Sequence, residues 1–228
     1  MGRRLLHRDD PAKAELIGNI KVTREDWLGA ALDALIDGGE EQVKVKVLGE
    51  RMGVSRSSFY WYFDSRQDLL DALLDHWQHC NTAALIAQSR KTAATITEAV
   101  CNVHHCVIDA ALFDNRLDFA IRDWAKRDVA VRAVLTTSEE ARVQALTEMF
   151  ERFDYAPTDA FARARVLYFM QAGYDAAELG ETLERRLSMA AHYLRIFTGV
   201  EPQPKELQAF ADFVRAVDAR DSKTVAQS

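Results

Sequence analysis

The feature that most constrains the fold of this sequence is a long stretch without glycine or proline, which runs from Val54 to Ala156. The four prolines of the chain stand at positions 11, 157, 202 and 204. Glycine and proline are the residues that most often interrupt helices, and alternating β-branched runs are scarce in this stretch, so long helices fit it best. The sequence therefore predicts an all-α protein in which more than half of the residues are helical.

Capping residues and turn signals place the expected helices along the chain. Thr23-Arg-Glu-Asp26 resembles a capping box with aspartate in the usual glutamate position, and Gly38-Gly39 end the helix that it begins. Ser65-Arg-Gln-Asp68 has a similar pattern, and the helix after it is expected to reach about Ser89. Other helices are expected over residues 45–52, 55–63, 93–110, 114–126, 128–153, 158–178, 181–198 and 204–219.

The segment 47–70 contains the parts of a helix-turn-helix. This motif needs a short helix, a tight turn in which glycine tolerates a positive φ, an apolar residue that fixes the turn, and a capped second helix. Met52-Gly53-Val54-Ser55 supplies the turn in that order. The side chains that can face inward are those of Leu48, Met52, Val54, Phe59 and Phe63, against Trp27, Ala31 and Leu35. The remaining side chains, Arg56, Ser57, Ser58, Tyr60, Trp61 and Tyr62, are left for the outer surface.

The consecutive aromatics Tyr60, Trp61 and Tyr62 are more than the small core of such a domain can bury. A groove in DNA is one explanation for large side chains exposed on the second helix of the motif. The alternative, that Tyr60 and Trp61 pack on neighbouring helices, is left open by the sequence.

The same segment resembles the DNA-binding domain of the tetracycline-repressor (TetR) family. That domain has a Gly-Val-Ser turn, an aromatic-rich recognition helix that ends in phenylalanine, and then Ser-Lys-Glu-x-Leu-Leu. The run from Tyr60 to Leu70 is similar to this pattern, with Arg66 where lysine is usual, Gln67 where glutamate is usual, and Tyr62 where histidine is common. The motif resemblance covers about residues 23–74.

The resemblance implies a sequence-specific DNA-binding transcriptional regulator, and not an enzyme. The expected organisation is an N-terminal three-helix helix-turn-helix domain over residues 1–66, with a basic N-terminal arm, and a larger helical domain for effector binding and dimerisation over residues 67–228. By resemblance it is a repressor that acts on double-stranded operator DNA as a homodimer and is released by a small hydrophobic effector. The last two long helices, near 158–178 and 181–198, would form the dimer, although their apolar stripes could also pack within one chain.

The resemblance also implies roles for single residues. Tyr60 and Arg66 would contact phosphates, and Arg66 would do so at the start of a helix, where the dipole attracts anions. Arg56, Ser57, Ser58 and Tyr62 would meet base edges, and Arg56 is the candidate for a bidentate contact to guanine. Lys46, at the start of the second helix, suits a phosphate contact. With Trp61, the predicted DNA-binding set is Lys46, Arg56, Ser57, Ser58, Tyr60, Trp61, Tyr62 and Arg66.

The distribution of charge is compatible with a local DNA-binding surface. The whole chain has a net charge of −6, but residues 1–24 and 42–66 each carry a net charge of +3. Binding of a polyanion needs such a local patch rather than a basic protein. Arg3 and Arg4 are candidates for a minor-groove arm, or they belong to an ordinary chain end.

An apolar effector pocket is expected among the larger helices. Its candidate residues are Trp77, Phe113, Phe119, Trp124 and Tyr168, and any of them could instead be ordinary core. The clusters His76-Trp-Gln-His79-Cys80 and Cys101-Asn-Val-His104-His105-Cys106 have no recognised metal-binding spacing, so a structural role is expected, with no metal or other cofactor.

Several other classes of protein are not indicated by the sequence. It contains no P-loop, no Gly-x-Ser-x-Gly or Gly-x-Gly-x-x-Gly motif, and no histidine three residues after a glutamate, so no enzyme is predicted. No apolar run has the length of a membrane span or a signal peptide, and three cysteines are too few and odd in number for a disulfide framework. The expectation is a cytoplasmic protein with no membrane partner.

Overall fold

The computed structural model describes residues 6, 9, 22–177 and 179–226, the last three of these by their backbone alone. Every regular element in this part of the chain is a helix, and none of its residues lies in a strand. The predicted all-α fold is confirmed, as is the predicted helical majority. No helix in the described ranges is both long and apolar enough to span a lipid bilayer.

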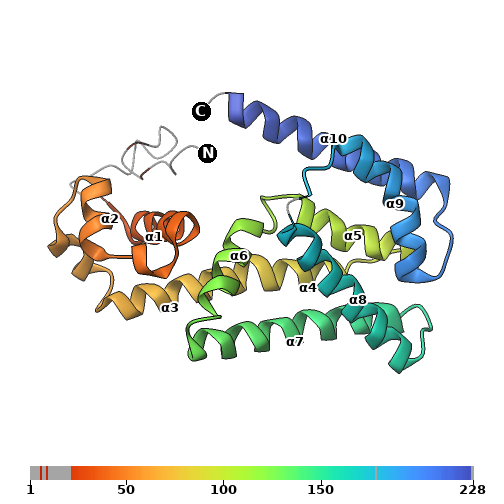
Figure 1. The fold of residues 1–228 in the computed structure, drawn as a ribbon, viewed down its shortest axis with the longest axis horizontal. Coiled ribbons are helices and arrows are strands. Elements are labelled where there is room, and N and C mark those ends of the chain that lie inside the picture. The colour runs from red at the N-terminus through yellow and green to blue at the C-terminus, as the bar shows by residue number, and fades with distance from the viewer. Residues whose placement is uncertain (1–5, 7–8, 10–21, 178, 227–228) are drawn as a thin grey trace. The chain divides into compact units, whose positions relative to one another are not determined.

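The helices belong to two compact units (Figure 1). Of the described residues, the first unit contains those up to Gln78 and residues 116–135. Its elements are α1 (Arg24–Gly38), the 3₁₀ turn η3 (Glu40–Gln42), α2 (Val45–Met52), the 3₁₀ helix η4 (Arg56–Trp61), α3 (Arg66–Trp77), most of α6 (Asn115–Trp124) and the start of α7 (Val129–Glu151). This unit extends past residue 66 because α3 packs on α1.

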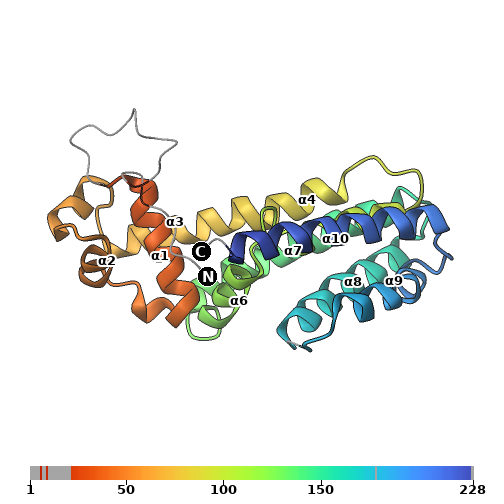
Figure 2. The same ribbon diagram turned by 90° about the horizontal axis from the view of Figure 1, so that it is seen from above.

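The second unit contains the remaining helices. They are the π-helical turn η5 (Gln78–Thr82), α4 (Ala83–Ser89), α5 (Ile96–Ile108), the rest of α7, α8 (Pro157–Ala176), α9 (Leu183–Thr198) and α10 (Pro204–Ala226). Within this unit α8 and α9 lie side by side, and α10 packs on α5 and α9 (Figure 2).

Helix α1 begins with the capping box that the sequence predicts. The Asp26 backbone N–H donates to the hydroxyl of Thr23 over 3.2 Å, and the Thr23 backbone N–H donates to the Asp26 carboxylate over 2.8 Å. These bonds satisfy backbone donors that the first turn of a helix leaves without partners. The helix ends before Gly39, whose φ of 80° lies in the region that favours glycine.

Aromatic contacts form the centre of the first unit. The ring of Phe59 meets that of Trp27 edge to face, with centroids 5.2 Å apart, and stacks on Phe63 at 5.3 Å. All three side chains are buried, and Leu48 and Met52 of α2 are buried in the same cluster. The inward-facing set that the sequence predicts is therefore confirmed for these residues, while Val54 is half-buried against the cluster.

Two predicted helices differ from the expectation in backbone geometry, and the last predicted helix runs to Ala226 rather than to about residue 219. Residues 56–61 form a 3₁₀ helix, and the serine hydroxyls at its start bond locally: Ser58 donates to the Ser55 carbonyl, and the hydroxyls of Ser55 and Ser57 bond to each other. The helix after Ser65 reaches Ser89 as predicted, but it changes to π-helical geometry at Gln78–Thr82. There the buried Asn81 amide bonds to both the N–H and the carbonyl of Asp114.

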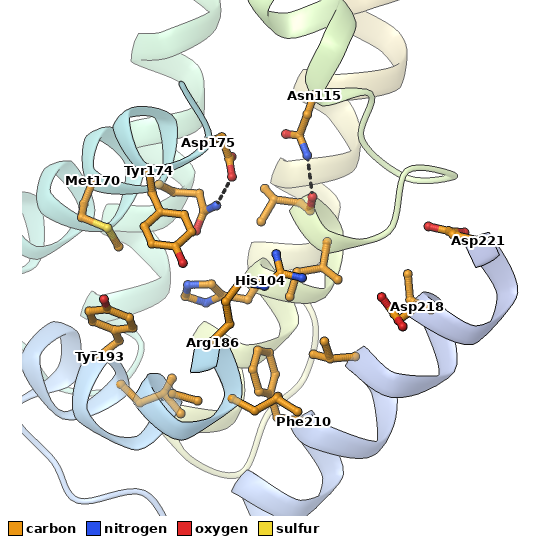
Figure 3. A pocket seen from close by; sticks show the side chains of 18 of the residues that line it. His104, Asn115, Met170, Tyr174, Asp175, Arg186, Tyr193, Phe210, Asp218 and Asp221 are labelled. Atoms are coloured by element: carbon orange, nitrogen blue, oxygen red, sulfur yellow. Dashed lines mark hydrogen bonds between the residues drawn. The ribbon is translucent and has the colours of Figure 1, made fainter. Parts of the chain in front are cut away.

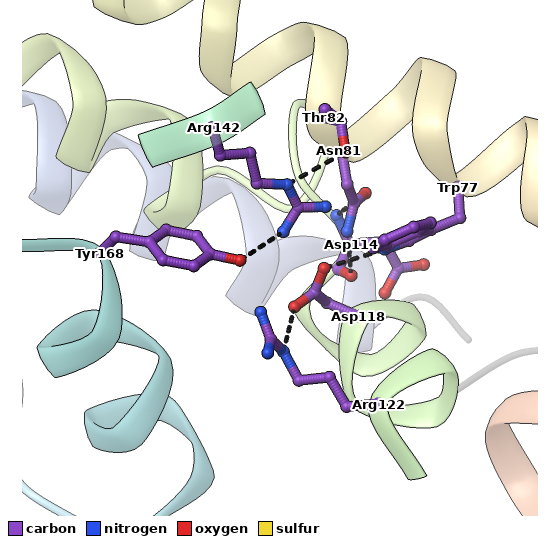
Figure 4. Close-up of polar contacts among 8 residues, drawn as sticks. All are labelled: Trp77, Asn81, Thr82, Asp114, Asp118, Arg122, Arg142 and Tyr168. Carbon is purple, nitrogen blue, oxygen red and sulfur yellow. Dashed lines mark hydrogen bonds and ion pairs between the residues drawn. The ribbon is translucent and has the colours of Figure 1, made fainter. Parts of the chain in front are cut away.

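A buried arginine organises the polar centre of the second unit. Arg142 on α7 is fully buried, and its guanidinium donates to the hydroxyls of Thr82 and Tyr168 over 3.0 and 3.3 Å (Figure 4). The guanidinium also lies over the ring of Phe113, 5.3 Å from its centroid. Phe113 and Tyr168 therefore contribute to the packing around a buried charge.

The capping box leads to a stability prediction. We expect Thr23→Ala to lower the free energy of unfolding by about 1 kcal/mol, because the first turn of α1 loses a hydroxyl acceptor. Thr23→Ser is the matched control, since it keeps the hydroxyl and should stay within a few tenths of a kcal/mol of the parent chain. Urea unfolding followed by circular dichroism measures both. Equal losses in the two variants would show that the hydroxyl does not stabilise α1.

Candidate nucleic-acid interface and ligand cavity

The turn between α2 and η4 depends on two glycines. Gly53 ends α2 in the left-handed conformation with φ at 67°, and the N–H of Val54 donates to the carbonyl of Gly49 over 2.9 Å. A Cβ atom on Gly49 would lie 3.0 Å from the carbonyl oxygen of Val54. Gly53 was predicted from the turn pattern but Gly49 was not, although a glycine inside a short helix is a signal of close backbone approach.

The predicted contact residues of η4 project outward. Trp61 is 84% exposed and Tyr60 is 55% exposed, while Arg56 and Ser57 are exposed and Ser58 is half-buried. Trp61 is thus not packed into the unit's core, and Tyr60 touches it only through an edge contact with Phe59 at 5.2 Å. The structure therefore brings these residues together on one exposed segment whose inner side is held by Phe59.

Tyr62 occupies a different position from its neighbours. It is half-buried, its ring packs against the core of the first unit, and its hydroxyl donates to the carbonyl of Val22 over 2.9 Å. The tyrosine therefore links η4 to the residue just before the α1 cap. Its contact to a base edge stays a prediction, and such a contact would have to form beside this internal bond.

Arg66, predicted to contact a phosphate, forms a brace within the chain. Its Nε donates to the carbonyl of Val43 over 2.6 Å, and its Nη2 donates to the carbonyl of Glu40 over 2.8 Å and pairs with the Glu40 carboxylate. These bonds fix the segment between η3 and α2. Nη1 makes none of these bonds. The phosphate contact of Arg66 stays a prediction, and Nη1 is the nitrogen that would make it.

The remaining residues predicted to contact DNA are Lys46 and the basic pair Arg3 and Arg4. Lys46 is exposed in the first turn of α2, and its Nζ lies 3.8 Å from Oε1 of Glu50. An ion pair of this kind on the surface contributes little to stability. Arg3 and Arg4 lie outside the described residues.

The aromatic residues predicted for an effector pocket do not form one group. Trp77 and Trp124 are buried in the core of the first unit, where the Trp77 indole N–H donates to Asp118 over 2.9 Å, and Phe119 of α6 is half-buried in that unit (Figure 4). Phe113 and Tyr168 belong to the core of the second unit. An effector contact for any of the five stays a prediction.

A cavity of about 640 Å³ lies within the second unit, between α5, α8, α9 and α10 (Figure 3). None of the five predicted aromatics lines it. Its walls combine apolar side chains with polar groups, among them His104, Asn115, Tyr174, Arg186, Tyr193 and Asp218. None of these residues was predicted to line a pocket, and His104 was considered only as part of the second His/Cys cluster.

The second His/Cys cluster lies on α5. Cys101 and Cys106 are buried, and burial raises the pKa of each thiol to about 12. The His105 ring lies against Phe213 with centroids 3.9 Å apart, and burial lowers its pKa to about 4. Among residues 22–177 and 179–223, no histidine, cysteine and carboxylate side chains gather into a group of metal-ligand type. The structural role of these residues stays a prediction.

Residues 28–73, which contain α2, the glycine turn and η4, match the family described as "Bacterial regulatory proteins, tetR family". The chain is 27% identical to the tetracycline repressor protein class C of Escherichia coli over 191 residues. This match covers 83% of the present chain and 70% of the repressor. Residues 28–73 therefore carry the DNA-binding domain of the TetR family. A chain with this domain is a DNA-binding transcriptional regulator, and the family of the domain is one of regulators, which are not enzymes.

Solved structures show the same fold as this chain. GusR of Salmonella enterica matches with a TM-score of 0.55 at 18% identity, over 85% of this chain and 94% of GusR. A transcriptional regulator from Rhodococcus sp. Rha1 matches with a TM-score of 0.57 at 17% identity, over 78% of this chain and 95% of that regulator. The helix-turn-helix and the larger helical part predicted from the sequence are confirmed.

The internal bonds of Arg66 lead to a second prediction. Lysine keeps the charge but has all its donors on one nitrogen, so Arg66→Lys cannot reproduce the separate bonds of Nε to Val43 and of Nη2 to Glu40. We expect the variant to lower the free energy of unfolding by about 1–2 kcal/mol in urea denaturation. Arg51→Lys is the control, because Arg51 is exposed on the neighbouring α2. If the two variants unfold at the same urea concentration, the brace does not stabilise the unit.

Proposed function

We propose that this regulator is a repressor that binds a palindromic operator as a homodimer and leaves it when a small molecule with an apolar body occupies the cavity of the second unit. The observation that carries the proposal is the outward face of η4, where Tyr60 and Trp61 are exposed beside Arg56. Large aromatic side chains on the surface of a protein indicate an interaction site.

The charge and shape of this face support direct reading of DNA. Arg56 is the first residue of η4 and is exposed, so its guanidinium is free to approach the N7 and O6 atoms of guanine in a bidentate way. Lys46 and the Nη1 of Arg66 are the further donors that we propose for phosphates. The first residues of a recognition helix are those that reach base edges when the helix enters the major groove.

The surfaces of α8 and α9 support dimerisation. Val166, Phe169 and Ile196 are among the large apolar side chains that are exposed here. On the same side of α8, nothing lies within 4 Å of the point where Gly173 would carry a Cβ atom, so a second helix could approach the backbone closely. An exposed apolar surface of this kind is typical of an interface between copies of a chain.

The cavity supports release by a small molecule. Its volume of about 640 Å³ lies in the range of sites for small ligands, and its wall of apolar groups with a few polar ones is typical of such sites. A ligand in the cavity would weaken DNA binding if it binds the DNA-free chain more tightly than the DNA-bound chain. The loss of DNA affinity would equal that difference in ligand affinity.

The role of Arg56 can be tested by the specificity of DNA binding. We expect Arg56→Ala to cost about 1–3 kcal/mol on the operator and to relax the preference at one base pair of each half-site, because a base contact carries sequence information. Arg215→Ala, a charge removed from the exposed face of α10, is the control and should leave binding unchanged. Affinities are measured on matched and mismatched duplexes at several salt concentrations. Equal weakening on the operator and on random DNA would make Arg56 a phosphate contact.

The dimer can be tested by placing a charge on its expected surface. Val166 on α8 is 54% exposed, and we expect Val166→Glu to convert the dimer to a monomer in light scattering, because two like charges would meet across the two-fold axis. Val129→Glu, at a valine that is 87% exposed on α7, is the matched control and should remain dimeric. A Val166→Glu chain that stays dimeric would place the interface elsewhere.

A further inference from the structure

Two opposite charges in the wall of the cavity have no partner within the described chain. Arg186 comes from α9 and Asp218 from α10, and both line the cavity (Figure 3). Both residues are exposed to solvent, and neither side chain forms a hydrogen bond or an ion pair with residues 22–177 or 179–223. Figure 3 shows the side chain of Arg186 extending into the space between the helices, with Asp218 on the far side of that space.

The other acidic groups of the wall already have partners. The Asp175 carboxylate accepts a hydrogen bond from the Gln171 amide over 2.9 Å. Asp221 accepts from the guanidinium of Arg220 over 3.1 Å. The charges left for a ligand are therefore one cation, Arg186, and one anion, Asp218.

His104 adds a third polar group to this set. Its Nδ1 bonds to the carbonyl oxygen of Val100 over 2.9 Å, so Nδ1 carries the proton and donates, and Nε2 is left as an acceptor. Burial lowers the pKa of this imidazole, which keeps it neutral near pH 7. No other described residue bonds to Nε2. These three side chains therefore offer two acceptors, Asp218 and His104, and one donor fork, Arg186.

Much of the remaining wall is apolar or aromatic. Leu187 of α9 and the α10 residues Phe210, Val214 and Val217 line the space that contains these polar groups. Such surface favours a hydrocarbon or ring body through burial of apolar area.

Accepting the proposed function of the cavity, we propose that its ligand is an amphipathic zwitterion, in which an anionic group and a protonated amine are separated by an apolar body. The guanidinium of Arg186 binds a carboxylate or phosphate in its planar fork, and Asp218 accepts hydrogen bonds from the ammonium group. A monoanion leaves Asp218 beside the bound molecule without a partner, and a monocation meets the like charge of Arg186. Only a molecule with both charges is complementary to both Arg186 on α9 and Asp218 on α10.

The test uses probes that differ in charge alone. Dissociation constants for the full-length chain are measured by titration calorimetry with 6-aminohexanoate, 8-aminooctanoate and 12-aminododecanoate, and with the alkanoate and the alkylamine of each length. We expect the best amino acid to bind at least roughly tenfold more tightly than both singly charged probes of its length. Equal binding by a singly charged probe, or no binding by any probe, overturns the proposal.

Charge variants locate the effect in the cavity. Arg186→Gln and Asp218→Asn should each abolish the preference for the zwitterion, and the exchange Arg186→Asp with Asp218→Arg should restore it, because the two walls again carry opposite charges. Arg215→Gln and Asp212→Asn alter an ion pair of 3.7 Å on α10 that does not line the cavity, and they should leave the preference unchanged. A preference that survives both single cavity variants contradicts the proposal.

A blocked cavity separates this proposal from the proposed function. Ala190 lines the cavity on α9, and Ala190→Trp should weaken the binding of every probe while circular dichroism shows an unchanged helix content. If blocking weakens binding but a monoanion equals the zwitterion, the charge assignment fails and the cavity remains the ligand site. If Ala190→Trp leaves all binding unchanged, the cavity is not the ligand site and both proposals fail.

Discussion

The edge-to-face contact between Trp27 and Phe59 determines which side of η4 meets the solvent. Phe59 is the one buried residue of η4, and its stacking on Phe63 adds a second fixed point just beyond the end of that helix. With the inner side held in this way, Arg56, Tyr60 and Trp61 have no place in the core. The exposed aromatic surface is thus a consequence of core packing, and the proposed reading of DNA depends on the core as much as on the residues that would touch bases.

Local sequence signals predicted most of the first unit. The capping box at Thr23, the left-handed Gly53 and the inward direction of Phe59 follow from rules that involve neighbouring residues only, and the structure has each of them. The position of Arg66 could not be predicted in this way. Its guanidinium bonds to Val43 and Glu40, which are distant in sequence, and a motif comparison contains no information about such tertiary contacts.

The cavity could not be predicted from the sequence for a related reason. Large aromatic side chains were predicted to line the pocket, but Trp77, Trp124 and Phe113 are buried in the cores of the two units. A cavity is a place where helices from distant parts of the chain fail to fill the space between them, and its wall here includes α5, α8, α9 and α10. The spacing of residues along one helix predicts its apolar side but not the gap that remains when four helices meet.

Selection of bound sequences from a random pool of DNA duplexes, at near-physiological salt, tests the central claim most directly. The claim is that this chain reads DNA sequence through the outward face of η4 as a symmetric dimer. It predicts that the parent chain enriches one two-fold symmetric sequence and that Trp61→Ala and Arg56→Ala reduce the enrichment, while Arg215→Ala does not. A pool that stays random, or an enrichment that survives the loss of both Arg56 and Trp61, would contradict the claim.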